Sequence, residues 1–363
     1  MTQSLTPFTP KKYSLKLVDL LWNETLYTKI SNTDYEGEIK KAGDRVVVRT
    51  AQKLTLSAYT KGMTLVAQDL NPTSEELIVD QQYYFKFIVD DVDKMQNDIS
   101  VIDTYSKGSK NDISELIDAD VLAYAWKQVA GDNQVGTDYV TGTVTVTATT
   151  GATVGSGTTF TAGMVGCAFK ATGQTAYYRV KTFTDGTNIV IEDMNGSGYT
   201  GGAVAGGTGY TIKAGTTITL TKSNIYQYIV NLRTVLSKKL TPRTGRFLVI
   251  NADIEGIILQ APEFIPAVGE AYASAVKQGM IGRIAGFDIY TSELVAGDAS
   301  LGYKFLAGDK AFLAFAMQIL DVVVIPSTMD PNSFVSTCKG LVTWGRKVFE
   351  GNRGRGAFLR GKV

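Results

Sequence analysis

Histidine does not occur anywhere in this 363-residue sequence. Without an imidazole, the Ser-His-Asp and Cys-His nucleophilic sites are excluded, and so are zinc sites that contain histidine. An enzyme built on this chain would have to transfer protons with carboxylates, lysine or tyrosine. The missing imidazole therefore counts against the commonest hydrolytic chemistries.

Cysteine is scarce, and long apolar runs are missing. Cys167 and Cys338 are too few and too far apart for a disulfide framework, so we expect both to be small buried residues in a reducing cytosol. No stretch approaches the ~20 apolar residues of a membrane span. The opening MTQSLTPFTPKKYSLKL contains no apolar run typical of a signal peptide. We therefore expect no membrane association.

An excess of charge of either sign is missing too. The 36 Lys and Arg residues against 35 Asp and Glu residues leave a net charge of +1. A bulk attraction to nucleic acid or to an anionic membrane is not indicated. The hydrophobic content of 44% is enough to fill a sizeable core, and the length favours two or three domains.

The segments that resemble binding motifs have simpler structural explanations. GSGYTG at 196–201 matches the dinucleotide-binding pattern G-x-G-x-x-G, but more glycine follows instead of a helix, which favours a flexible β-turn. Asp90, Asp91 and Asp93 are favoured as acids between a strand end and a helix start, rather than as a metal cluster. No phosphate-binding G-x-x-x-x-G-K-[ST] sequence occurs. We predict no catalytic, cofactor or metal site, and no enzyme.

The first ninety residues predict an arm followed by strands. Residues 1–36 are polar and mixed, and we expect an arm that becomes ordered on a partner, with one helix around Leu15–Leu26. RVVVRT at 45–50 and LTLSAY at 54–59, joined by AQK, predict a hairpin. In LIVDQQYYFKFIV, alternate residues from Leu77 to Val89 are apolar, which is typical of a strand with one wet face.

Helical periodicity returns on either side of the middle of the chain. Asp112 followed by Glu115 is a capping-box-like start for a helix whose apolar stripe comprises Ile113, Leu116, Ile117, Val121 and Tyr124. A second helix is predicted from Ser223 until before Pro242, with a stripe of Ile225, Tyr228, Ile229, Leu232 and Leu236. RFLVINA at 246–252 then predicts a buried strand, and DIEGIILQA the next helix.

Between the two helices the composition changes abruptly. From 140 to 221, 16 of 82 residues are Gly and 22 are Thr, and short alternating segments such as TVTVT and NIVIED are separated by Gly-rich turns. This pattern predicts a small all-β barrel or sandwich inserted where a host loop brings both ends together. Its core is predicted to be self-contained and to comprise Val144, Val146, Phe160, Val180, Phe183, Ile189, Ile191 and Ile218.

Basic residues suggest contacts between subunits. On the predicted hairpin we expect Arg45, Arg49 and Lys53 to meet acidic groups of a neighbouring subunit. The closing segment carries a local surplus of positive charge, and we favour subunit contacts there over phosphate binding. The residues concerned in this segment are Arg346, Lys347, Arg353 and Arg355.

The order of the host segments resembles the major capsid proteins of tailed bacteriophages, those of the HK97 fold and its P22-like branch. The resemblance lies in IKKAGDRVVVRT, LIVDQQYYFKFIVDDVDKM, GMIGRIAGFDIYTSELV (279–295) and GLVTWGRKVFEG. It implies an α+β HK97-like fold with six parts: an N-terminal arm (1–36), an extended β-hairpin loop (37–90), a spine helix and peripheral domain (91–139), the inserted all-β domain (140–221), an apical α/β domain (222–320) and a return to the peripheral domain (321–363). In GRIAGFD, Gly282 and Gly286 are expected to supply special backbone conformations or close packing.

This resemblance implies a shell subunit of the virion, made in the cytoplasm of the bacterial host. Its expected partners are further copies in hexamers and pentamers, with scaffolding, portal and decoration proteins, and packaged DNA only through weak contact. One alternative is a tail-tube or baseplate protein, which should lack the long helix. Another is a carbohydrate-binding or hydrolytic protein built on the β domain, whose only acids there would be Asp185, Glu192 and Asp193.

Overall fold

The computed structural model describes residues 25–35, 45–50, 54–69, 73–90, 101–261, 283–319, 323–325 and 335–363. These residues belong to two compact units. Among the described residues, the first comprises those within 82–116 and 319–343, and the second those within 24–81, 117–318 and 344–363.

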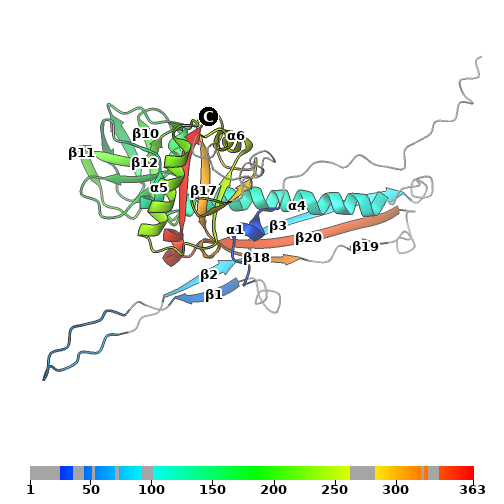
Figure 1. Ribbon diagram of the computed structural model, residues 1–363, viewed down its shortest axis with the longest axis horizontal. Coiled ribbons are helices and arrows are strands. Elements are labelled where there is room, and N and C mark those ends of the chain that lie inside the picture. Colours follow the sequence, from blue (N-terminus) through cyan, green and yellow to red (C-terminus); the bar gives the residue numbers. More distant parts are fainter. Residues whose placement is uncertain are drawn as a thin grey trace, which may run out of the picture. The chain divides into compact units, whose positions relative to one another are not determined.

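The first unit combines a long helix with antiparallel strands (Figure 1). Helix α4 (Val101–Ala125) begins here, and β20 (Val335–Lys347) pairs with both β3 (Gln81–Asp90) and β19 (Val323–Ile325). The rings of Phe85 and Phe87 stack with their centroids 6.4 Å apart. A Cβ placed on Gly340 would lie 2.5 Å from the Phe85 ring, so glycine lets β20 approach that ring closely.

Helix α4 is longer than its sequence signals predict. It already includes Val101, so Asp112 and Glu115 lie inside it and the predicted helix start is wrong. The apolar stripe is right for the part within the second unit, where Ile117 and Val121 are buried. Residues 91–100, including Asp91 and Asp93, lie outside the described residues.

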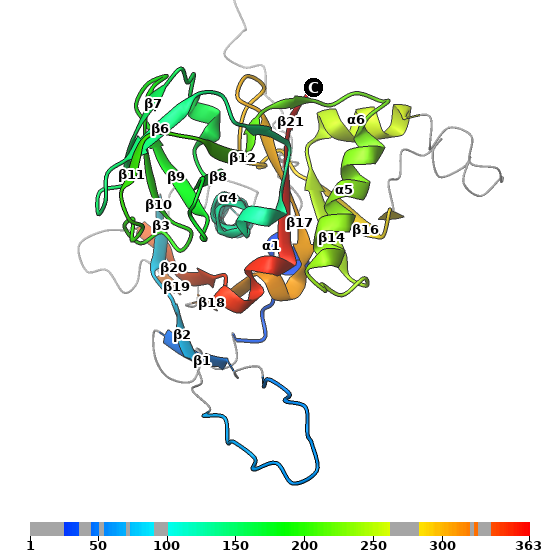
Figure 2. The ribbon, with the colours of Figure 1, turned by 90° about the vertical axis from the view of Figure 1, so that its left-hand side faces the viewer.

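The second unit contains a mixed sheet with two helices beside it. Its strand order is β13 (Ile218–Thr219), β21 (Gly356–Lys362), β17 (Tyr303–Asp309), β14 (Arg246–Ile250), β16 (Phe287–Thr291) and β15 (Arg283–Ile284), and β4 (Gln134–Val135) also pairs with β21. Helices α5 (Ile225–Lys238) and α6 (Ala252–Gln260) lie next to one another beside the sheet (Figure 2). Both helices and the fully buried β14 confirm the sequence prediction for this region.

The segment before β1 is fixed to its own chain. Asp118, which is 2% exposed, accepts hydrogen bonds from the backbone N–H groups of Leu26 (2.9 Å) and Tyr27 (2.7 Å). These bonds satisfy two of the backbone N–H groups that have no partner within the short helix α1 (Tyr27–Ile30). Residues 25–35 of the predicted arm therefore need no partner to be ordered, whereas most of the predicted helix at 15–26 lies outside the described residues. Strand β18 (Ala314–Ile319) forms a bridge to Asn32.

Residues 137–216 form a closed β-barrel. Its strands are β5 (Thr137–Tyr139), β6 (Thr143–Val146), β7 (Ala152–Ser156), β8 (Ala168–Ala171), β9 (Tyr178–Phe183), β10 (Asn188–Asp193), β11 (Val204–Thr208) and β12 (Tyr210–Thr216). The pairing order runs β11-β6-β7-β10-β9-β8-β12-β5. Because β5 leads into β6 and β11 into β12, the two ends of this order are continuations of strands already in it, and the sheet closes on itself (Figure 2).

The barrel core follows the predicted positions with two exceptions. Val144, Val146, Phe160, Val180, Ile189 and Ile191 are each at most 2% exposed, as predicted. Phe183 is only half-buried, and Ile218 pairs with Gly361 in the neighbouring sheet, so its assignment to the barrel core is wrong. The prediction missed Tyr139, Phe169 and Tyr210, which form an aromatic cluster with Phe160.

Both ends of the barrel segment lie on one edge of β21. Gln134 and Val135 pair with Phe358 and Leu359, and Ile218 and Thr219 pair with Gly361 and Lys362, all in parallel. The chain therefore leaves the host sheet and returns to it within one short stretch of a single strand. This is the geometry in which an inserted domain leaves its host undistorted.

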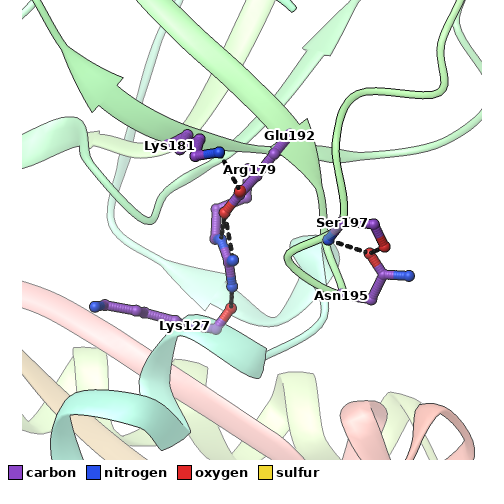
Figure 3. A network of polar contacts seen from close by, with 6 residues as sticks. All are labelled: Lys127, Arg179, Lys181, Glu192, Asn195 and Ser197. Carbon is purple, nitrogen blue, oxygen red and sulfur yellow. Dashed lines mark hydrogen bonds and ion pairs between the residues drawn. The ribbon is translucent and has the colours of Figure 1, made fainter. Parts of the chain in front are cut away.

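Buried arginines fasten the barrel to the rest of the unit. Arg179 on β9 pairs with Glu192 on β10, and its Nη1 donates to the carbonyl of Lys127 at 3.1 Å (Figure 3). Arg360 on β21 is 2% exposed and donates to the carbonyls of Leu301, Ala214 and Gly215. Hydrogen bonds from these buried cations therefore join the barrel to the host, in addition to the packing of the barrel's own core.

Lys127 lies in η2 (Trp126–Gln128), the short helix that continues α4. The other short helices among the described residues are η3 (Gly131–Asn133), η4 (Ala162–Met164), η5 (Lys310–Phe312) and η7 (Glu350–Arg355). Trp126 of η2 packs edge-on against Phe358 of β21, with centroids 5.6 Å apart. Gly166 of the barrel faces the Trp126 ring so closely that a Cβ would collide with it. One indole therefore contacts both the host sheet and the barrel.

The Arg179–Glu192 pair gives a stability prediction. Both side chains are at most 9% exposed, so Arg179→Met leaves a buried carboxylate with only the exposed Lys181 3.7 Å away. We expect the free energy of unfolding to fall by about 3–5 kcal/mol. The double variant Arg179→Met/Glu192→Met should lose much less than the sum of the two single variants, because neither charge then remains buried. Urea denaturation of the wild type, the two single variants and the double variant gives the free energies of unfolding for this double-mutant cycle. A loss in the double variant equal to the sum of the two single losses would contradict the prediction.

The turn between β9 and β10 gives a pH prediction. Hydrogen bonds from Asn188 and Thr187 lower the pKa of Asp185 to about 2. A depressed carboxyl pKa stabilises the folded state above the unfolded value of about 3.9, and this contribution disappears as the pH falls from there through about 2. Carboxyl NMR should show Asp185 titrating near 2. Asp185→Asn should flatten the acid dependence of unfolding over that range, and an Asp185 resonance titrating near 4 would refute the assignment.

Candidate functional site: an exposed apolar loop

A metal-binding cluster is not found in the described part of the chain. There, no cluster of three or more His, Cys, Asp or Glu side chains is placed to hold a metal ion. The helices of that part include none with the length and apolarity that crossing a membrane requires. GSGYTG lies in the loop between β10 and β11, where Asn195 Oδ1 accepts from the Ser197 backbone at 2.9 Å (Figure 3). That loop is a local turn and contains no helix.

An extended loop is the most unusual surface of the second unit. Strand β1 (Arg45–Thr50) pairs with β2 (Thr73–Ile78), from Arg45 opposite Ile78 to Thr50 opposite Thr73. The predicted hairpin of 45–50 with 54–59 is therefore wrong, and the chain makes a much longer excursion before it returns. In Figure 1, residues 54–69 extend beyond the end of this ribbon.

One face of the ribbon is buried, and the other faces solvent. Val46 and Leu77 form a core cluster with Val79, with Ala314 and Ala316 of β18, and with Phe349, which follows β20. On the opposite face, Val47 is 50% exposed and Ile78 is 46% exposed. The buried face holds the base of the loop in place, while the other face stays available.

The loop itself exposes large apolar side chains. Every residue from 54 to 69 is exposed, and the loop forms neither helix nor strand. Leu56 is 95% exposed and Val66 is 89% exposed, and the other large apolar residues exposed here are Leu54, Tyr59, Met63 and Leu65. The connection from β1 to β2 is 22 residues long (51–72), and its described residues 54–69 form no helix or strand. Loops of such length are uncommon in a compact domain and often carry function. Several large apolar side chains left exposed on one segment are typical of an interaction site.

Two of the three predicted contact residues, Arg45 and Arg49, are exposed on the ribbon. Arg45 forms an exposed ion pair with Glu76 at 3.3 Å within the chain. Arg49 is exposed, and Lys53 lies outside the described residues. Sequence reasoning emphasised these charges and missed the apolar character of 54–66. The signal was present in LTLSAYTKGMTLV, but alternation there was interpreted as a strand that would find a partner in its own hairpin.

The basic C-terminal residues are mostly engaged within the chain. Arg346 pairs with Asp120 at 2.7 Å and lies over the Tyr124 ring at 5.0 Å, and Arg355 pairs with Asp309 at 2.9 Å. Lys347 is half-buried. Arg353 is also half-buried, and burial lowers its pKa while Glu350 opposes that effect. Contacts of these four residues with another subunit stay a prediction.

Gly286 occupies a backbone conformation that favours glycine. It lies with Ala285 in the two-residue turn between β15 and β16, with φ of +89° for Gly286 and +47° for Ala285. A Cβ on Gly286 would meet no atom within 4 Å, so the requirement is conformational and not one of packing. Gly282 lies outside the described residues.

This turn gives a prediction that separates conformation from packing. We expect Gly286→Val to lower the free energy of unfolding by about 2 kcal/mol, because a β-branched residue is poorly accommodated at positive φ. Gly286→Asn should be close to neutral, since asparagine tolerates this region. Chemical denaturation of both variants is the measurement, and equal losses for Val and Asn would contradict a conformational role.

The comparisons with known proteins agree on one fold. No protein-family model and no curated protein matches the sequence. Among solved structures, one from Mycobacterium phage Che8 matches with a TM-score of 0.63 at 18% identity, over 98% of each chain. The capsid structure of cyanophage P-SCSP1u matches with 0.64 at 12% identity, over 99% of this chain and 95% of that chain. The mature capsid of bacteriophage PhiM1 matches with 0.57 at 11% identity, over 97% and 92%.

The chain therefore has the fold of phage capsid subunits. The predicted α+β, HK97-like fold is confirmed, and the similarity extends over nearly the whole chain. The P22-like branch stays a prediction.

Proposed function

We propose that this chain is a major capsid protein that assembles with copies of itself into the icosahedral head shell of a tailed bacteriophage. The observation that carries this proposal is the loop at 54–69, whose apolar side chains are left in water on a chain with a capsid fold. A solitary protein would be stabilised by burying them. Their exposure is explained if a neighbouring copy covers them.

The role proposed is structural and not catalytic. A shell subunit needs surfaces that are used many times rather than a reactive centre. Interfaces of standard size bury about 1,600 Å² in total, and several of them on each subunit combine into a stable closed lattice through multivalency. The near-zero net charge suits copies that must pack side by side.

The proposal extends to parts and partners. The proposed parts of the subunit are the arm at 1–36, the loop region at 37–90, the spine helix at 91–139, the inserted segment at 140–221, the apical part at 222–320 and the return at 321–363. The barrel strands that carry the inserted segment run from 137 to 216. The proposed partners are copies in hexamers and pentamers, with scaffolding, portal and decoration proteins, and packaged DNA by weak contact only. The proposed location is the virion, after synthesis in the cytoplasm of the bacterial host.

The alternatives receive less support. Helix α4 is the long helix that a tail-tube or baseplate protein was expected to lack. A hydrolase built on the barrel would need two free carboxylates across a groove. Glu192 is buried against Arg179, and Asp193 accepts two hydrogen bonds from Thr200. These acids are used for structure.

Electron microscopy of the purified full chain tests the proposal. Closed shells are expected, whereas tubes would favour the tail alternative and a monomer at high concentration would contradict both.

The loop gives a sharper version of this test. Leu56→Asp/Val66→Asp should abolish assembly and leave thermal unfolding of the monomer nearly unchanged, because neither side chain contributes to its own core. The control Val140→Asp changes a residue on the barrel that is 59% exposed and should assemble normally. Normal shells from the loop variant would remove the loop from the interface.

A further inference from the structure

The turn after α5 has a large apolar side chain in a conformation suited to glycine. The N–H of Thr241 donates to the carbonyl of Leu236 at 3.2 Å, which closes the end of the helix around Leu240. Leu240 has φ of +59° and is 89% exposed. Glycine is the usual residue at such a position because it avoids a steric penalty of roughly 1–2 kcal/mol. Nothing in the fold of the subunit requires leucine here.

The turn is held in a fixed shape from below. Arg246, which is 2% exposed, donates to the carbonyls of Thr241 and Pro242 at 2.7 Å each and to that of Arg233 at 3.3 Å. The guanidinium thus ties both ends of the turn together. Leu240 is presented on a rigid support, so little conformational entropy would be lost when it is buried by a partner.

Exposed cations accompany the leucine. They are Arg233, Lys238, Lys239 and Arg243, on the last turns of α5 and in the turn itself. Lys239 has an exposed ion pair with Asp132 at 3.3 Å. A partner surface that fits the turn must therefore be acidic and must also accept an apolar side chain. Duplex DNA would satisfy the cations but would leave the leucine without a role.

Acidic side chains gather at the other end of the same strand. The turn leads into β14, which is five residues or about 17 Å long. Beyond β14, the N-terminal part of α6 carries Asp253 and Glu255, and Glu293 accepts from the N–H of Ala252 at 2.8 Å. In Figure 2 the turn lies at the bottom of this α/β part and α6 at its top. The two ends thus carry opposite charges.

We propose that the turn at 238–243 docks head to tail on the α6 end of a second copy of this chain, with Leu240 buried at the centre of the contact. The cations of the turn face Asp253, Glu255 and Glu293 of that copy. This inference rests on the proposed function, because it assumes assembly from copies. A contact between different patches that repeats from copy to copy closes into a ring when the rotation permits.

A substitution that stabilises the subunit should weaken this contact. Leu240→Gly removes the strain, so its thermal midpoint should rise, yet the concentration at which the full chain assembles should rise at least tenfold. Thr149→Gly is the matched control, because Thr149 is exposed with φ of +71° but carries no large apolar side chain. It should raise the midpoint without changing the assembly threshold. Assembly of Leu240→Gly at the wild-type threshold would overturn the proposal.

Charge exchange identifies the matching surface. Lys238→Glu/Arg243→Glu should impair assembly, and adding Asp253→Lys/Glu255→Lys in the same chain should restore it. Failure of the fourfold variant to assemble, although it is folded by circular dichroism, would refute the α6 end as the partner surface. If the first pair assembles normally but no longer retains duplex DNA on a filter, the turn is a nucleic-acid contact and the proposal is wrong. The wild-type chain is assembled in parallel. If it forms shells while the variants contradict the contact, the inference fails but the proposed function does not.

Discussion

Hydrogen bonding along both edges of β21 is the constraint on which the second unit depends. One edge pairs with β17 and so with the rest of the α/β sheet. The other edge pairs with β4 and β13, which are the two ends of the barrel segment. Arg360, from the same strand, adds hydrogen bonds to barrel carbonyls. The C-terminal strand is thus the element that fixes the inserted domain to its host.

The loop and the turn after α5 share a physical logic. In each case a buried group of residues fixes the backbone in place, and an apolar side chain on that backbone is exposed to water in the isolated subunit. For the loop this group is the Val46 and Leu77 cluster, and for the turn it is Arg246. Both arrangements cost the isolated subunit stability. Such costs are retained where an assembled state recovers them.

Periodicity and composition predicted the elements better than their partners. The Gly/Thr bias correctly indicated an all-β segment, and the apolar stripe of α5 and the buried run of β14 predicted elements that the structure confirms. The strand at 45–50 was also right, but its partner at 73–78 was missed because alternation carries no information on the length of the connection. Asp112 looked like a helix start only because capping patterns are local.

The interaction surfaces were harder to predict, because they depend on what the fold leaves uncovered. Arg346 and Arg355 are basic in the sequence, yet Asp120 and Asp309, far away along the chain, bind them. Leu240 carries no sequence signal for exposure, since its role depends on a positive φ. The capsid resemblance, by contrast, rested on the order of segments over the whole chain, and order survives when the identity to similar structures is only 11–18%.

The position of the barrel has a consequence for the order in which the chain folds. The side chain of Asn133 donates a hydrogen bond to the carbonyl of Gly356, which lies 223 residues further along the chain. This part of the host sheet therefore cannot be completed until β21 is present. Contacts of such separation form slowly. The strands of the barrel pair only with one another, within residues 137–216, so the barrel can form first as the chain emerges from the ribosome. In doing so it brings β4 and β13 into line, end to end, so that β21 can pair with both along one edge once it has been synthesised.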